Sequence, residues 1–131
     1  MALPNGAGGY QIGDGNLNEI LFSNSATPTA YTAAATLTTT DLAGGLVVYT
    51  SSSTADLALP TAAATDTAFS SAKVYSSFDI SLVATSTGVP TITAGTGWTL
   101  VGSGAGVASK SVLFRAVKTG DGAWSLYRIA G

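Results

Sequence analysis

The chain contains neither cysteine nor histidine among its 131 residues. Without cysteine, disulfide bonds and thiolate metal sites are excluded. Without histidine, the chain lacks the commonest general base and the commonest metal ligand of proteins. Its many serines therefore have no imidazole to activate them as nucleophiles. These absences predict a protein that is not an enzyme and that uses no cofactor or metal.

Charged residues are also scarce, at 9% of the chain, and the formal net charge is −2. A nucleic-acid-binding surface needs clustered cations to neutralise phosphates. Here the basic residues are scattered, so we expect no nucleic-acid partner. Because the net charge is small, electrostatic repulsion between copies of the chain is weak. The centres of protein interfaces are also depleted in charge. Self-association is therefore expected. The five basic residues are Lys73, Lys110, Arg115, Lys118 and Arg128.

No segment has the pattern of a secretion signal or of a membrane helix. Residues Met1–Gly9 lack a basic stretch ahead of an apolar one. Two long uncharged stretches, Ile20–Thr40 and Ile80–Ser109, contain proline and are crowded with serine, threonine or glycine. Such composition disfavours a membrane-spanning helix. We expect a soluble protein, made in the cytoplasm, with no membrane partner.

What the chain does contain is typical of β structure, because it is rich in threonine and valine, which favour strands, and in glycine, which favours turns. The clearest strand is Phe78–Ala84, where apolar residues occupy every second position. Residues 61–72 are the candidate helix, with Thr61 as its N-cap. Further strands are predicted at Leu46–Thr50, Asp56–Leu59, Thr91–Ala94, Trp98–Gly102, Ser111–Lys118 and Ala123–Ala130.

Short strands at this spacing, separated by glycine and proline turns, predict an all-β fold. We expect residues 36–131 to form a small antiparallel β-sandwich or a jelly-roll-like barrel with one short helix. The last two strands should form a hairpin around Asp121–Gly122. A two-residue turn there would set Arg115 opposite Arg128, which is unfavourable. A shift by one residue pairs Phe114 with Tyr127, so we predict that register, with a longer loop or a β-bulge.

Residues 1–35 differ from the rest and are predicted to form an extended N-terminal arm. Residues 1–18 are mostly glycine, asparagine and small side chains, which bury too little apolar surface to order themselves. The alternative is a frayed tail. Two short apolar segments, Tyr10–Ile12 and Ile20–Phe22, favour an arm that becomes ordered on a partner. The candidate anchor residues are Tyr10, Ile12, Ile20, Leu21 and Phe22.

The remaining candidates for chemistry favour structural roles. Of the seven carboxylates, only Asp56 and Asp79 fall on predicted strands, each facing outward, so caps and solvated positions explain the set better than a pair of catalytic acids. The glycine-rich segment Gly102–Gly106 does not run from a strand into a helix, as a nucleotide loop would. Aromatic residues could line a sugar-binding face, but core packing is favoured. These aromatics are Tyr75, Trp98, Phe114, Trp124 and Tyr127.

Several segments occur in an order that resembles a small β domain of tailed-bacteriophage virion proteins. In that family a Leu-Thr segment and a Gly-Gly step lead into a strand, and a Leu-Pro-Thr-Ala step opens a short helix. The most specific elements are Gly-Thr-Gly-Trp-Thr-Leu-Val-Gly and the closing Phe-Arg…Leu-Tyr-Arg hairpin. The matching segments here are Leu37–Thr40, Gly44–Gly45, Leu59–Ala62, Phe78–Ser81, Gly95–Gly102 and Phe114–Arg128. The region over which their order and spacing match covers about three-quarters of the chain and leaves out residues 1–35.

The resemblance implies a head-decoration, or capsid cement, protein of the virion. Proteins of this kind are typically trimers seated on the outer surface of the capsid, where they stabilise the shell. The expected partners are then the major capsid protein and other copies of this chain, and the arm residues are the expected capsid contacts. The same domain also occurs in tail structures. The alternative is therefore a tail or fibre module that binds host-surface polysaccharide through exposed aromatic residues.

Overall fold

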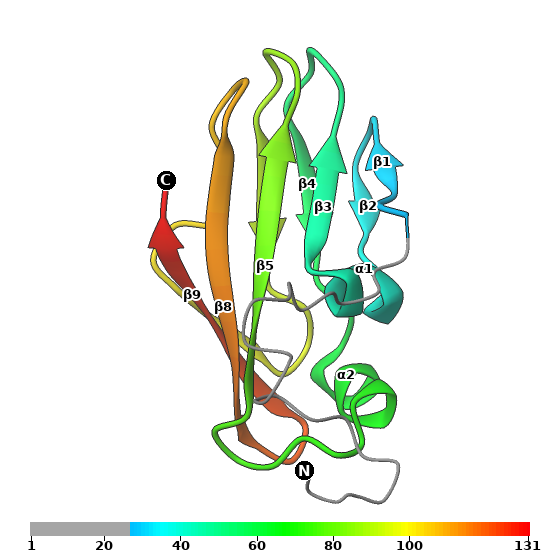
Figure 1. Cartoon of the computed structure of the whole chain (residues 1–131), viewed down its shortest axis with the longest axis vertical. Coiled ribbons are helices and arrows are strands. Elements are labelled where there is room, and N and C mark those ends of the chain that lie inside the picture. Colours follow the sequence, from blue (N-terminus) through cyan, green and yellow to red (C-terminus); the bar gives the residue numbers. More distant parts are fainter. Residues whose placement is uncertain (1–26) are drawn as a thin grey trace, which may run out of the picture.

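The computed structural model describes residues 27–131 and is built mainly of β-strands (Figure 1). Nine strands form two sheets, and two short helices lie at the crossings between them. The elements are β1 (Ala30–Tyr31), β2 (Ala35–Thr36), α1 (Thr39–Gly44), β3 (Leu46–Tyr49), β4 (Ala55–Ala58), α2 (Ala62–Ala68), β5 (Ser77–Ala84), β6 (Pro90–Thr93), β7 (Trp98–Val101), β8 (Ser111–Gly120) and β9 (Ala123–Ala130).

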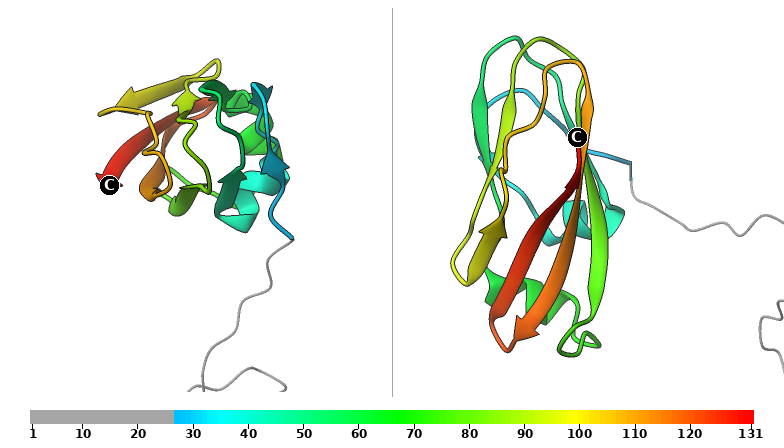
Figure 2. Two further views of the ribbon diagram at one scale, coloured as in Figure 1. Left: turned by 90° about the horizontal axis from the view of Figure 1, so that it is seen from above. Right: turned by 90° about the vertical axis from the view of Figure 1, so that its left-hand side faces the viewer.

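The first six strands alternate between the two sheets. Strands β1, β3 and β5 are parallel neighbours in a six-stranded sheet with the order β1-β3-β5-β8-β9-β7. Strands β2, β4 and β6 form a three-stranded sheet that is parallel throughout. In the larger sheet β8 runs antiparallel to both β5 and β9, whereas the edge strand β7 is parallel to β9. The views in Figure 2 show the three-stranded sheet behind the larger one.

One apolar core lies between the two sheets. The larger sheet contributes the inward residues of β3, β5, β8 and β9, and the smaller sheet contributes Leu57 and Ile92. The helices and their flanks add Leu42 and Ala62. Side chains that are almost completely buried include Tyr49, Ile80, Leu82, Phe114, Trp124 and Leu126. Alternating side chains leave the other face of the six-stranded sheet without a covering layer in the described part of the chain.

Most of the predicted strands are confirmed, but the strand directions are not. The alternation along Phe78–Ala84 is present, with Ile80, Leu82 and Ala84 buried. The expectation of antiparallel pairing holds only among β5, β8 and β9. From β1 to β6 the chain crosses to the other sheet after every strand, and it returns parallel to the previous strand of the same sheet. Alternation of side chains records which face is buried and carries no information about the direction of the neighbouring strand.

Residues 27–131 contain two helices where one was predicted. The predicted helix is present as α2 and has Thr61 as its N-cap, although it ends at Ala68. The additional helix α1 begins after Thr38, whose side chain and backbone exchange hydrogen bonds with Asp41 in a capping box. It ends at Gly45, which has a φ of 71°, a left-handed conformation that glycine adopts without steric cost.

The β8–β9 hairpin has the predicted bulge but a different register. Gly120 pairs with Ala123, so the turn is the two-residue Asp121–Gly122 connection, and the register shifts between Lys118 and Gly120. The shift sets Arg115 opposite Tyr127, so the two arginines do not face each other. The predicted pairing of Phe114 with Tyr127 is wrong by one residue, because one bulge is enough to separate the arginines.

The β structure begins before the predicted start of the domain at residue 36. Ala30 and Tyr31 pair with Val48 and Tyr49, and Ala35 pairs with Leu57. Part of the segment predicted as an arm therefore supplies an edge strand to each sheet.

Candidate functional site

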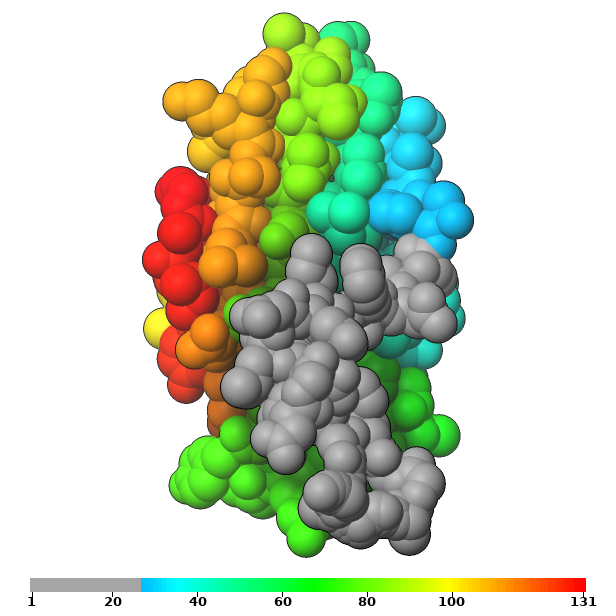
Figure 3. Space-filling model, in the orientation of Figure 1, coloured from blue at the N-terminus to red at the C-terminus, as the bar shows by residue number. Residues whose placement is uncertain are grey.

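The outer face of the six-stranded sheet is a candidate binding surface of the described structure. Figure 3 views this side of the molecule, where β8, β5 and β3 run side by side. Four of its large apolar side chains are more than a third exposed, and the only charged residues at its outward strand positions are Asp79 and Arg115. The apolar residues on this outer face are Leu46, Val48, Val83, Val101, Leu113, Val117, Tyr127 and Ile129.

The two charges on the outer face neutralise each other. The Arg115 Nε donates to Asp79 Oδ1 at 2.8 Å and Nη2 donates to Oδ2 at 3.3 Å, so the pair is bidentate. The hydrogen bonds from Arg115 lower the pKa of Asp79, and the carboxylate in turn raises the pKa of the guanidinium. Both side chains are about half exposed. Such a pair presents little net charge to an approaching protein.

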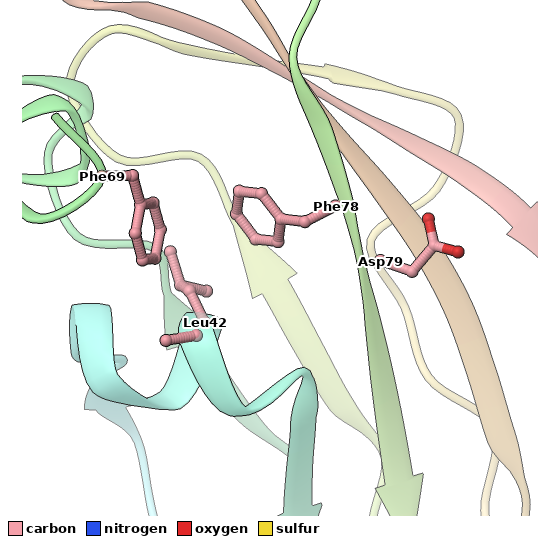
Figure 4. Close-up of a pocket in the computed structure, with 5 residues that line it drawn as sticks. Leu42, Phe69, Phe78 and Asp79 are labelled. Atoms are coloured by element: carbon pink, nitrogen blue, oxygen red, sulfur yellow. The ribbon is translucent and has the colours of Figure 1, made fainter. Parts of the chain in front are cut away.

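A small apolar groove opens beside the outer face, between α1, α2 and β5 (Figure 4). Leu42, Phe69 and Phe78 point toward one another in it, and the two phenylalanine rings meet edge to face at 5.3 Å. The volume of the groove is about 260 Å³, which is below the range of roughly 300–1,000 Å³ that small-molecule sites occupy. Ala43 and Asp79 complete the lining, and Asp79 points to the opposite side of β5. The groove can accept an apolar side chain.

A partly buried cluster around Asp66, whose side chain is 20% exposed, joins α2 to the β8–β9 hairpin. The Trp124 indole N–H donates to Asp66 Oδ1 at 2.8 Å, and the Gly122 backbone N–H donates to Oδ2 at 2.5 Å. The Lys118 ammonium lies 3.2 Å from Oδ1 and also donates to the carbonyl of Ala72. The hydrogen bond from Gly122, followed by that from Trp124, holds the pKa of Asp66 below its usual value. The carboxylate is fully occupied by structural contacts.

Asp41 has a comparable structural role at the start of α1. Burial alone would raise its pKa, but hydrogen bonds donated by the Thr38 N–H and the Tyr31 hydroxyl outweigh burial and lower it. Burial, together with the bond to this carboxylate, raises the pKa of Tyr31 to about 12. The pair fixes β1 against α1.

These shifts predict opposite effects of acid and of alkali on stability. The pKa values of Asp41, Asp66 and Asp79 are lower in the folded state, so the stability they contribute is present above an unfolded pKa of about 3.9 and is lost as the pH falls further. Tyr31 has a raised pKa, so its contribution is present below about pH 10 and is lost as the pH rises toward 12.

Urea unfolding followed between pH 2 and pH 12 measures both effects. Tyr31→Phe should lower the unfolding free energy at pH 7 by about 1 kcal/mol, the usual net value of one hydrogen bond, and should flatten the alkaline decline. Tyr127→Phe is the matched control, because it removes a hydroxyl from the exposed outer face. An equally steep alkaline decline in Tyr31→Phe would contradict the assignment.

The structure places some of the site residues predicted from the sequence and does not describe others. The anchors Tyr10, Ile12, Ile20, Leu21 and Phe22 all lie outside the described residues. Of the aromatic candidates, Trp98, Phe114 and Trp124 are in the core, as the core-packing interpretation predicted. Tyr127 is 37% exposed on the outer face, and Tyr75 is 80% exposed.

Sequence reasoning missed Asp66 and Lys118 as partners. The sequence predicts capping or solvation for Asp66, and it places Lys118 only among the five scattered basic residues. The 51 residues that separate Asp66 from Lys118 contain no pattern that links the two. The one signal was the position of Lys118, which shares the inward alternation of Phe114 and Ala116. A lysine in phase with buried residues requires a buried acceptor.

Within residues 27–131, no group of three or more carboxylates is placed to hold a metal ion. No helix in that range is long and apolar enough to cross a membrane. No family model, curated protein or solved structure matches the chain.

Proposed function

We propose that this chain is a structural protein of a bacteriophage virion, which binds the outside of the capsid and stabilises the shell. In this proposal residues 27–131 form a β-sandwich, and several copies, three in our proposal, assemble around a local axis of the capsid. The observation that carries the proposal is the outer face of the six-stranded sheet, where four large apolar side chains are more than a third exposed and the single pair of charges is internally compensated.

The physical argument is the cost of removing a surface from water. Burying an unpaired charge is expensive, whereas apolar side chains gain from burial. The outer face exposes Leu46, Val101, Tyr127 and Ile129 by 36–49% each, and its ion pair can stay intact in an interface. Exposed apolar side chains on one face are typical of protein contacts. They support a role in assembly.

The ionisable groups that are held most tightly support the same role. Asp41, Asp66 and Lys118 each bond groups from other parts of the domain, so their charge stabilises the fold. A domain that exposes apolar side chains on one sheet face is suited to permanent attachment. When several copies act together, each weak contact to the shell is strengthened by effective concentration.

The direct test is the copy number of the chain in purified particles of the phage that encodes it. Quantitative mass spectrometry should find a number close to that of the major capsid protein, or a fixed large fraction of it. A few copies per particle would refute the decoration role. That result would favour the second candidate, a tail or fibre module that binds polysaccharide, for which the exposed ring of Tyr75 is the supporting observation.

Removal of residues 1–22 tests the proposed role of the N-terminal arm. The core of the described residues runs from Leu37 to Leu126 and is kept whole by this truncation, so the truncated protein should keep its melting temperature. Its binding to shells that lack the protein should weaken at least 100-fold, because several arms act together in each oligomer. Cosedimentation with the shells measures the affinity, and Ile20→Ser/Leu21→Ser/Phe22→Ser in the full chain is the matched variant. Unchanged binding of both proteins would exclude the arm as the anchor.

A further inference from the structure

The turn formed by residues 73–76, between α2 and β5, has a feature that the fold does not require. Tyr75 has a φ of 74°, a left-handed conformation that is rare for a bulky residue. Its side chain is 80% exposed, and that of the preceding Val74 is 48% exposed. The turn lies at one end of the molecule, beside the β8–β9 turn (Figure 1).

Backbone hydrogen bonds hold this strained conformation in place. The Tyr75 N–H donates to the Lys118 carbonyl at 2.7 Å, and the Lys118 N–H donates to the Ser76 carbonyl at 2.9 Å. Within the turn, the Ser76 N–H donates to the Lys73 carbonyl at 2.8 Å, and the Lys73 N–H donates to the Ser76 hydroxyl at 2.9 Å. The turn is therefore fixed to β8.

The side chain of Tyr75 brings the fold no compensating gain. Its ring lies in solvent, and glycine would adopt the same backbone conformation without steric cost. Strained residues that the surrounding structure holds in place occur preferentially at functional sites. A rigid aromatic residue beside an aliphatic one is also a typical interface anchor, because little conformational entropy is lost when it binds.

We propose that Val74 and Tyr75 form a preorganised anchor that inserts into an apolar socket on a protein partner. The inference rests on the proposed function, so the partner is the capsid subunit beneath the domain. The convex shape of the turn requires a concave partner, and its exposed cation, Lys73, favours a socket with an acidic rim. Stacking on a sugar is less favoured. Sugar binding needs several hydrogen-bonding side chains around the ring, whereas the neighbouring Ser76 hydroxyl already accepts the Lys73 backbone N–H.

The test compares Tyr75→Gly with the parent chain in the full-length protein. Glycine relieves the backbone strain, so the melting temperature should stay the same or rise. Affinity for purified shells that lack the protein should fall at least 10-fold in cosedimentation. Ser52→Ala, in the exposed β3–β4 loop at the opposite end (Figure 1), is the control and should bind as the parent does. A photo-crosslinking residue in place of Tyr75 should react with the major capsid protein.

The other outcomes separate the two proposals. If the parent chain binds no shells, the decoration role fails, and this inference fails with it. If the parent binds and Tyr75→Gly binds equally well, only the Tyr75 anchor is overturned. The inference is also overturned if the variant keeps its shell affinity but loses binding to immobilised lipopolysaccharide of the host, because the ring would then be a sugar contact.

Discussion

Replacing Asp66 with alanine is expected to lower the free energy of unfolding by about 3 kcal/mol, the lower end of the cost of breaking a buried ion pair. The substitution removes the acceptor for the Gly122 N–H and the Trp124 indole. It also leaves the Lys118 ammonium, whose side chain is 9% exposed, without its nearest carboxylate. The next one, Asp121, is 3.7 Å away and fully exposed, so it offers little compensation.

A double-mutant cycle with Lys118→Met identifies the source of this loss. If the unpaired ammonium dominates, Asp66→Ala/Lys118→Met should be less destabilised than the sum of the two single variants, by about 1–3 kcal/mol. Chemical denaturation in urea measures all four proteins. Asp121→Ala is the control and should change stability by less than about 0.5 kcal/mol, as an exposed charge does. Strict additivity in the cycle would show that Asp66 and Lys118 do not act as a pair.

The local elements could be predicted from sequence because their causes are local. Phe78–Ala84 alternates in phase with burial, and the Thr61 cap lies immediately before its helix. The strand directions depend on which sheet the chain enters after each crossing, and no residue pattern records that choice. The helix α1 could have been predicted, because Thr38 and Asp41 have the spacing of a capping box.

Only part of the outer face of the six-stranded sheet could be predicted from the sequence. Alternation along Phe78–Ala84 predicts that Asp79 and Val83 face outward, and they do. The pairing of Asp79 with Arg115 across 36 residues follows from the contact between β5 and β8, which the sequence does not specify. The left-handed conformation of Tyr75 had no signal, because glycine or asparagine is expected at such positions.

Gly104→Ala is expected to cost about 3 kcal/mol of stability, near the upper end of the usual cost of forcing extra atoms into a packed site. A Cβ at this position would lie 2.0 Å from the carbonyl oxygen of Ile92. That carbonyl belongs to the backbone of β6, and the Gly104 carbonyl in turn accepts the Ile92 N–H at 2.8 Å. Because both contacts involve backbone, no side-chain movement can relieve the clash.

Arg128 further restricts movement of the loop around Gly104. Its guanidinium donates to the carbonyls of Ser103 and Ala105, so the residues on both sides of Gly104 are tied to β9. The glycines that resemble a nucleotide loop are therefore explained by close packing of this loop against the edge strand β6. Gly44→Ala is the matched control: its Cβ would meet no atom within 4 Å, at the last residue of α1.

The free energy of unfolding of the Gly44→Ala control should rise by about 0.5–1 kcal/mol, because alanine restricts the unfolded chain and fits a helix. Thermal and urea unfolding of the two variants should thus shift in opposite directions from the parent. Equal stabilities would show that the loop moves away from β6 at little cost. Arg128→Met should then be as stable as the parent. A large loss in Gly104→Ala that Arg128→Met reduces would instead identify the guanidinium as the group that prevents the loop from moving.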